Sequence, residues 1–344
     1  MSLKIVLMGT GDFAVPTFRA LLNSSHEIVG VLTQPEKTGS GHHQHANPVK
    51  ELAVAVSVPV FQPARVNRPE MLETLRSLQA DVFIVAAYGQ ILRHELLAIP
   101  RLGAFNLHGS LLPRHRGAAP VQYAVWKGDV VTGVTIFQIE LALDAGPIVG
   151  RIETPIGSSE TSGELMLRLA ELSVPLTLDI VTKLEAGTAE FKPQDTALVT
   201  LAPKIPREAG LIDWSKSGHD IDCHIRAMQP WPRASSVLQR RDQPPLRCLV
   251  SQVTAIPDSE APGRIVARVS DAGFPDSDVA ARSNIPGRVV EYQGRLLVAA
   301  GDGWLEMLKL QPEGRKAVDG RSFVNGYPLA EGDGFLTTMK RNDS

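Results

Sequence analysis

The chain has 344 residues, of which 43% are hydrophobic and 21% charged, and its formal net charge at pH 7 is −2. This composition is that of a soluble globular protein, and the length predicts two domains because single cores stop growing at about 250–300 residues. No apolar run approaches the roughly 20 residues that span a bilayer. The near-neutral charge excludes a general attraction to nucleic acid, and residues 205–344 hold as many acidic as basic residues. Any RNA partner must therefore bind at a local basic patch.

The N-terminal sequence and the cysteines indicate the cellular compartment of the protein. Residues 1–13, MSLKIVLMGTGDF, lead directly into a strand-like segment without a cleavable signal. Cys223 and Cys248 are too few for a disulfide framework and lack the CxxC spacing of a zinc site. We therefore expect a cytoplasmic protein with no membrane association and inert cysteines. A monomer is the default expectation, because the sequence does not show whether the chain pairs with itself.

Apolar runs and amphipathic segments alternate over the first two hundred residues, which is the pattern of parallel strands joined by crossover helices. Apolar runs predict strands at 4–9, 26–34, 81–89, 104–109 and 133–141. Apolar residues three and four apart predict helices at 16–24, 47–56, 69–78 and 162–187, the last with a capping signal, a stop at Gly187 and Pro175 as a candidate kink. The sequence thus predicts an α/β domain with a Rossmann-like, doubly wound, mostly parallel sheet.

Gly9, Gly11 and Ala14 in GTGDFA fit the glycine fingerprint of dinucleotide-binding proteins. The second strand of such a protein ends in an acidic residue that binds the ribose, whereas this one ends at Gln34. We therefore predict a tight turn at the head of the sheet and no NAD site.

Four histidines near the N-terminus raise the question of a metal site. His42, His43 and His45 lie in a Gly- and Ser-flanked loop, and His26 lies apart from them. Metal ligands usually sit at fixed spacing on a regular element with supporting partners. We predict a solvated loop and no metal.

Asn106, His108 and Asp144 form the strongest constellation of chemical groups. Residues two apart on a strand face the same side, so Asn106 and His108 would project into one cleft at the carboxyl end of the sheet, where ligands of open α/β sheets bind. Asp144 lies in the loop after the strand at 133–141, and could bring a carboxylate to the same cleft. An amide can stabilise an oxyanion, an imidazole can take up and return a proton, and a carboxylate can orient and charge-balance the imidazole. Together they suit acyl transfer without a nucleophilic serine or cysteine. From the residues alone, a purely structural role, with His108 capping a strand and Asn106 supporting a turn, stays equally open.

The sequence pattern changes after Thr200, from alternating strands and helices to a linker and short strands. The segment 201–214, LAPKIPREAGLIDW, has the prolines and glycine of a linker, and short turn-separated strands are predicted at 234–239, 246–256, 287–293, 295–301 and 304–311. We infer a small β-barrel domain. Residues 268–286 are polar and poor in aromatic residues, which predicts a mobile surface insertion.

Residues 106–122, NLHGSLLPRHRGAAPVQ, followed by GVTIFQIELALDAGPIVG at 133–150, resemble the folate-dependent formyltransferases. Further stretches resemble the members of that family that act on methionyl-tRNA: MGTGDFAVPTFRALL, ADVFIVAAYGQIL, TLAPKIPREAGLIDWSKS, IRAMQPWP and GDGWLEMLKLQPEGRKA. The resemblance covers nearly the whole chain. It implies transfer of the formyl group of 10-formyltetrahydrofolate, a cosubstrate, to the free α-amine of initiator methionyl-tRNA by direct amine attack through a tetrahedral intermediate.

The resemblance also implies roles for individual residues and segments. Asn106, His108 and Asp144 match the catalytic trio of the family. Two segments match those that hold the pterin of the folate; their residues are Ala87, Tyr88, Gly89, Ile91 and Leu92 in the first and Leu141 and Leu143 in the second. A third segment matches the loop that closes the site and consists of Ser110, Leu111, Leu112 and Pro113. The implied domains are a catalytic domain at 1–203, a linker at 204–212, an oligonucleotide-binding (OB)-like tRNA-binding domain at 213–330 and a tail at 331–344.

The chain departs from the family in its tRNA-contacting segments. The family usually carries a Gly-Arg-Gly-Lys-Lys core that holds the acceptor end, whereas this chain has Gly39, Ser40, Gly41, His42 and His43. Neutral histidines contribute little to phosphate binding, so Ser40 and His42 are weak candidate contacts. Arg114 and Arg116 are candidate phosphate contacts from the loop that follows the trio's strand.

Two further positions carry predictions of their own. Ala142 replaces a family glycine and would restrict its turn if the turn needs a positive φ. Trp231 is predicted to pack in a core between the domains. Two alternatives stay open for the function: folate-dependent formylation of a small amine, such as an amino sugar or a glycinamide nucleotide, and a non-catalytic folate- or RNA-binding module.

Overall fold

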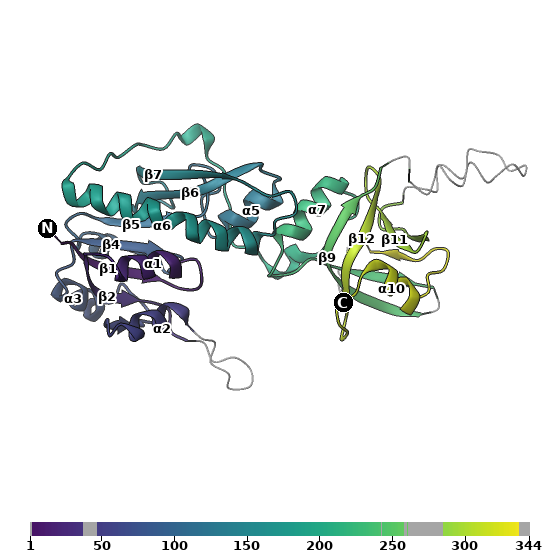
Figure 1. Cartoon of the computed structure of the whole chain (residues 1–344), viewed down its shortest axis with the longest axis horizontal. Coiled ribbons are helices and arrows are strands. Elements are labelled where there is room, and N and C mark those ends of the chain that lie inside the picture. The colour runs from purple at the N-terminus through teal and green to yellow at the C-terminus, as the bar shows by residue number, and fades with distance from the viewer. Residues whose placement is uncertain (1, 37–46, 242, 258–259, 261–284, 337–344) are drawn as a thin grey trace, which may run out of the picture. The chain divides into compact units, whose positions relative to one another are not determined.

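A computed structural model describes residues 2–36, 47–241, 243–257, 260 and 285–336 (Figure 1). Two compact units divide the chain: unit 1 comprises Met1–Ala124, Val130–Gly157 and Glu164–Lys204, and unit 2 comprises Val125–Asp129, Ser158–Gly163 and Ile205–Ser344. The predicted histidine-containing loop at 39–45 and nearly all of the predicted insertion at 268–286 lie outside the described residues.

Unit 1 is built on a seven-stranded sheet in the order β3-β2-β1-β4-β5-β6-β7. Its strands are β1 (Lys4–Gly9), β2 (Glu27–Leu32), β3 (Val60–Phe61), β4 (Val82–Ala86), β5 (Ala104–His108), β6 (Val131–Gln138) and β7 (Ile148–Pro155). The first five strands of this order pair in parallel, which confirms the predicted doubly wound, mostly parallel sheet. The prediction of a parallel strand at 133–141 was wrong in direction, because β6 pairs antiparallel with both β5 and β7.

Helices cover both faces of this sheet, namely α1 (Val15–Leu22), α2 (Pro48–Ala55), α3 (Pro69–Ser77), α4 (His94–Leu97), α5 (Pro120–Trp126) and α6 (Ser162–Ala186). On one face, Val6 and Phe83 of the strands share a buried apolar cluster with Leu75 of α3 and Leu96 of α4. On the other, the hydroxyls of Thr17 in α1 and Ser173 in α6 are 2.7 Å apart, so these two helices lie side by side. Alternate residues of each strand therefore face different helices, as a strand buried on both sides requires.

The helix boundaries follow local signals, with one exception. Pro48 and Pro69 begin α2 and α3 at the position where a missing N–H costs nothing, and the Asn47 side chain accepts a hydrogen bond from the N–H of Lys50. α6 continues through Pro175 as one helix of 25 residues. At its start, the Ser162 hydroxyl lies 2.8 Å from the carbonyl oxygen of Ala227 and 2.6 Å from that of Gln229, so its one hydrogen is shared between two acceptors in unit 2, of which Ser162 is a part.

The glycine-rich turn between β1 and α1 has a packing function. A Cβ on Gly9 would lie 2.6 Å from the Phe18 ring and 2.8 Å from the carbonyl oxygen of Ala86, and Gly11 has φ +76°. Both positions therefore need glycine for reasons of space or backbone conformation. This confirms the predicted tight turn at the head of the sheet.

Unit 2 contains a six-stranded antiparallel sheet in the order β10-β11-β12-β9-β8-β13. Its strands are β8 (Ser235–Arg240), β9 (Gln243–Ala255), β10 (Val289–Tyr292), β11 (Arg295–Ala299), β12 (Trp304–Pro312) and β13 (Gly334–Phe335), accompanied by α7 (Gly218–Ala227) and α10 (Gly320–Gly326). A bridge between Arg288 and Gly334 joins the β10 edge to the β13 edge, so the sheet is a nearly closed barrel. The predicted barrel is confirmed, although β13 falls in the segment predicted as a tail; two residues are too few for a strand signal.

The burial of the two cysteines and of Trp231 bears on the predictions made for them. Cys223 and Cys248 are both buried, and burial raises the pKa of the Cys248 thiol to about 12, in agreement with the expected inertness. Trp231 is 52% exposed, so the prediction of core packing was wrong at this position. Among the described residues, none of the helices combines the length and the apolar character that a membrane span requires.

Candidate active site

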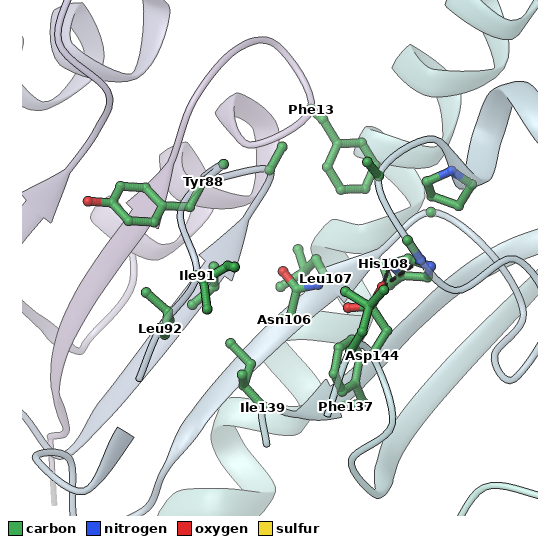
Figure 2. A pocket seen from close by; sticks show the side chains of 18 of the residues that line it. Phe13, Tyr88, Ile91, Leu92, Asn106, Leu107, His108, Phe137, Ile139 and Asp144 are labelled. Carbon is green, nitrogen blue, oxygen red and sulfur yellow. Dashed lines mark hydrogen bonds and ion pairs between the residues drawn. The ribbon is translucent and has the colours of Figure 1, made fainter. Parts of the chain in front are cut away.

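Asn106 and His108 lie on β5, which is flanked by β4 and β6. Asn106 is opposite Val85 of β4 and Phe137 of β6, and His108 is opposite Thr135. Both side chains line one cavity of about 590 Å³, where they point toward Asp144 (Figure 2). The alternation of a strand thus places the amide and the imidazole on the same side, as predicted.

Asp144 reaches this cavity by a route that the sequence did not predict. Because β6 runs antiparallel to β5, its end at Gln138 lies beside Phe105, away from His108. Residues 139–147 return along the edge of the cavity and bring the Asp144 carboxylate back to the imidazole. Asp144 adopts a left-handed backbone with φ +48°, which aspartate tolerates better than most residues. Ala142 is not among the described residues with positive φ, so the replacement of the family's glycine carries no backbone strain there.

The two ring nitrogens of His108 have different neighbours. Nε2 is 2.9 Å from the carbonyl oxygen of His115, and since a carbonyl can only accept, Nε2 carries a hydrogen and donates it. Nδ1 faces Asp144, with 3.8 Å between Nδ1 and Oδ2. That distance is too long for a hydrogen bond but short enough for the carboxylate to stabilise a positive charge on the ring once the ring is protonated. The His115 carbonyl therefore holds the ring by a hydrogen bond, and the Asp144 carboxylate lies beside Nδ1 without one.

Burial and charge act in opposite directions on His108. The imidazole is only 4% exposed, and this burial, the largest influence, lowers its pKa below the usual value for histidine. The Asp144 carboxylate and the hydrogen bond to His115 both raise the pKa, and the neighbouring His115 ring lowers it. The net result is a neutral imidazole at pH 7 whose free lone pair is on Nδ1, beside an anion that stabilises a proton there.

Gly117 holds the Asp144 carboxylate in place. Its N–H donates to Asp144 Oδ2 at 2.7 Å, and it has φ +127°, which is accessible to glycine and rarely to other residues. A Cβ at this position would lie 2.6 Å from the carbonyl oxygen of Ala202. Gly117 was not predicted as a site residue, although it stands in the RHRGAAP stretch that follows the trio's strand.

The residues predicted to hold the pterin surround the same cavity. It is lined by all seven residues of the two segments concerned, Ala87, Tyr88, Gly89, Ile91, Leu92, Leu141 and Leu143. Ile91, Leu141 and Leu143 are large apolar side chains that are mostly exposed. A mostly apolar cavity with apolar residues at its rim suits a flat heteroaromatic ring. Phe13, Phe137 and Met166 also line it and were not predicted.

The loop predicted to close the site does not line the cavity. Ser110, Leu111, Leu112 and Pro113 are all described, yet none of them faces it. The Ser110 hydroxyl donates to the carbonyl of Arg114, and the Leu112 N–H donates to the hydroxyl of Thr135. The loop is thus held by hydrogen bonds within itself and to β6, and contact with a ligand would require that the ligand extend beyond the cavity.

The candidate tRNA contacts are only partly visible. Arg114 is exposed, while Arg116 is half-buried and donates from Nε and Nη2 to the Gln194 side chain. Ser40 and His42 lie outside the described residues. His26 accepts a hydrogen bond from the N–H of Leu3, and the described ranges contain no group of three or more His, Cys, Asp or Glu placed to hold a metal ion.

Known proteins are similar to this chain over almost its entire length. The family described as formyl transferase matches residues 3–181, and the formyl transferase C-terminal domain matches residues 204–328. A methionyl-tRNA formyltransferase of Symbiobacterium thermophilum is 40% identical over 97% of this chain and 95% of its own. A methionyl-tRNA formyltransferase of Rhodopirellula baltica is 40% identical over 96% of both chains.

Solved structures share the fold at low sequence identity. WlaRD, a sugar 3N-formyl transferase solved in the presence of dTDP and 5-N-formyl-THF, is 14% identical with a TM-score of 0.61, covering 92% of this chain and 100% of its own. The N-formyltransferase from Helicobacter canadensis in complex with folinic acid and dTDP-3-aminofucose is 17% identical with a TM-score of 0.61, covering 89% and 99%.

Proposed function

This chain belongs to the formyl transferase family, and from that membership we propose that it transfers the formyl group of 10-formyltetrahydrofolate to the α-amine of initiator methionyl-tRNA. Similarity at 40% identity to methionyl-tRNA formyltransferases, over both units, supports this acceptor. The observation that carries the proposal is the convergence of Asn106, His108 and Asp144 on one cavity.

The cavity has the size and character that a folate cosubstrate needs. Its volume of about 590 Å³ is within the usual range of about 300–1,000 Å³ for small-molecule sites. The pterin would be held by the backbone of residues 87–89 and by Ile91, Leu92, Leu141 and Leu143. The folate supplies an activated formyl group; the side chains of the chain orient it and manage the charge and the proton.

Asn106 is placed to stabilise negative charge on the formyl oxygen as the amine adds to the formyl carbon. Among the described residues, no hydrogen-bond partner is found for its side chain, so the amide is available to a ligand in the cavity. A donor positioned before the reaction needs no reorganisation when the charge develops.

His108 is placed to take the proton that the attacking amine loses. With Nε2–H bonded to His115, the nitrogen that accepts it is Nδ1, which faces Asp144. The carboxylate then stabilises the imidazolium, and the proton can pass from Nδ1 to the departing N10. Histidine is suited to this exchange because its protonated and neutral forms are close in free energy near pH 7.

Unit 2 is proposed to bind the tRNA. A nearly closed antiparallel barrel is a fold that tracks nucleic acid along its strands. We propose residues 1–203 as the catalytic domain, 204–212 as a linker and 213–330, extended by β13, as the tRNA-binding domain. Arg114, Ser40 and His42 remain proposed contacts to the acceptor end, and 110–113 a proposed closing loop. The proposal places the enzyme in the cytoplasm as a monomer, which gel filtration tests.

The decisive experiment measures formyl transfer from 10-formyltetrahydrofolate to four acceptors: methionyl-tRNA, uncharged tRNA, a 3-amino sugar nucleotide and glycinamide ribonucleotide. The proposal predicts that only methionyl-tRNA is formylated, at its α-amine. Formylation of a small amine in preference to methionyl-tRNA would replace the acceptor and keep the chemistry. Binding of folate and RNA with no transfer to any acceptor would contradict catalysis altogether.

A further inference from the structure

Gln194 lies outside the cavity but beside the loop that carries Asp144. It lies in the irregular segment that follows α6. In this segment, Lys192 and Ile148 exchange two backbone hydrogen bonds of 2.8 Å each. Ile148 is the first residue of β7, immediately after the loop at 139–147. This pairing fixes the backbone two residues before Gln194 and brings the Gln194 side chain to the loop.

The Gln194 side chain uses both ends of its amide. Nε2 donates to the carbonyl oxygens of Asp144 and Gly146, at 2.9 Å and 2.8 Å. Oε1 accepts from Nε and Nη2 of Arg116, at 3.1 Å and 2.7 Å. The orientation of the amide is fixed by chemistry, because a guanidinium only donates and backbone carbonyls only accept.

These contacts close a ring of hydrogen bonds around the catalytic carboxylate. Arg116 holds Gln194, Gln194 holds the backbone of Asp144, and the Asp144 side chain accepts from Gly117, the residue after Arg116. The backbone of Arg116 is itself anchored, since its N–H donates to Thr200 and its carbonyl accepts from Ala202. Each end of Asp144 is therefore tied to the same short segment.

The Asp144 loop needs such support. Asp144 has φ +48°, and its neighbours Leu141 and Leu143 are exposed, so the loop is not held by burial of its side chains. Its carboxylate acts on His108 through charge alone across 3.8 Å, an interaction that weakens with any displacement. We propose that Gln194, clamped by Arg116, is a positioning residue that keeps the Asp144 carboxylate beside Nδ1 of His108. This role rests on the proposed function.

The same geometry gives Arg116 a role different from that of a phosphate contact. Its Nε and one of its Nη atoms are engaged by Gln194, a neutral partner that fits the planar fork of the guanidinium. Removal of the Arg116 side chain should then lower kcat and leave the affinity for tRNA unchanged.

The test is a cycle of Arg116→Ala, Gln194→Ala and the double variant, assayed at saturating substrates. Each single variant is expected to lower kcat by about 10- to 100-fold with an unchanged KM for methionyl-tRNA, and the double variant to be no worse than the singles, because the two side chains act as a unit. Gln194→Glu, which keeps the shape but points an oxygen at two carbonyl oxygens, should lower kcat similarly. Asp179→Ala is the control, since Asp179 pairs with Lys183 on the exposed side of α6 in unit 1, away from the cavity, and should leave kcat unchanged.

A second measurement does not depend on the acceptor. The titratable groups that face His108 are Asp144 and His115. If Asp144 moves away in the Gln194 variants, its raising influence is lost and the pKa of His108 falls further below the usual value. NMR titration of labelled histidines, with His108→Asn to assign the signal, should show this fall, and the acid limb of kcat/KM should move to lower pH.

Two results would overturn the positioning role. One is an unchanged kcat and an unchanged His108 titration in both folded Gln194 variants. The other is a raised KM for tRNA in Arg116→Ala, with a KM that depends less steeply on salt and with effects that add to those of Gln194→Ala. Such a result would make Arg116 a phosphate contact. Absence of formyl transfer in the wild-type chain would instead count against the proposed function, while the titration would still decide whether Gln194 positions Asp144.

Discussion

At the scale of single residues, the site depends on which group each polar atom faces. His108 is the clearest case, because the His115 carbonyl fixes the hydrogen on Nε2 and leaves Nδ1 as the basic nitrogen. Asp144 then faces the nitrogen that we propose gains the proton. The same three side chains in another arrangement of donors and acceptors would not support proton transfer.

Alanine substitution separates the roles of the amide and the imidazole. Asn106→Ala removes the proposed donor to the formyl oxygen and is expected to lower kcat by about 10² to 10³-fold. His108→Ala removes the proposed acid–base group and is expected to lower kcat by about 10² to 10⁴-fold. Circular dichroism should show that both variants are folded, and wild-type turnover in either would contradict the assigned role.

The pH dependence follows from the direction of the His108 pKa. The imidazole works as a base only when neutral, and burial lowers its pKa, so kcat/KM should fall only below the pH at which an ordinary histidine becomes protonated. Asp144→Asn removes a charge that raises this pKa, and the acid limb should therefore move to still lower pH. A limb that stays in place would mean that Asp144 does not act on His108. Pre-steady-state kinetics across pH 4–8 measure the position of this acid limb in the wild type and in Asp144→Asn.

At the scale of elements, the turn after β5 determines where the carboxylate is held. Gly117→Ala would force φ +127° on a residue with a side chain and place its Cβ against the Ala202 carbonyl. We expect a loss of about 1–3 kcal/mol in the free energy of unfolding, with lower activity. Gly187→Ala is the control, because Gly187 has φ +68° but no atom within 4 Å of an added Cβ. Equal losses in urea unfolding of the two variants would show that the clash at Gly117 is relieved.

The segment after β4 carries a buried hydroxyl whose loss should be tolerated. Tyr88 is buried, and its hydroxyl has no hydrogen-bond partner among the described residues. Burial raises its pKa, which keeps the phenol neutral. An unsatisfied buried polar group costs about 1–3 kcal/mol, so Tyr88→Phe should be neutral or raise the free energy of unfolding. Urea denaturation measures it, and a clear loss of stability would reveal an ordered water bonded to the hydroxyl.

At the scale of the whole molecule, charge sets the interaction with tRNA. The net charge is −2, and the sequence has Ser40, His42 and His43 where the family usually has Arg, Lys and Lys. The triple variant Ser40→Arg, His42→Lys, His43→Lys should lower KM for methionyl-tRNA and steepen its dependence on salt. The slope should grow by about 0.7–0.9 for each phosphate gained. An unchanged slope would mean that this loop does not approach the acceptor end.

Local patterns in the sequence determined much of the fold and of the site. Apolar runs and helical spacing predicted the strands and long helices, because burial imposes periods of two and of 3.6 residues on any chain. The spacing of Asn106 and His108 predicted that they share a face, since a strand alternates. The position of Asp144 after a neighbouring strand predicted a carboxylate at the same cleft, and family resemblance added the residues around the cavity.

The tertiary structure decided what depends on contacts between distant segments. The direction of β6 is set by its pairing with β5 and β7, and it determines that Asp144 reaches His108 by a returning loop. The carbonyl of His115 and the N–H of Gly117 are backbone groups, which leave no pattern of side chains to read. The side-chain amide of Gln194 lies 50 residues from Asp144 in the sequence, and only folding brings the two together. The sequence alone determined which chemical groups are present and which of them share an element; packing decided which atoms of those groups face one another, because hydrogen bonds depend on position and direction, which only the folded chain fixes.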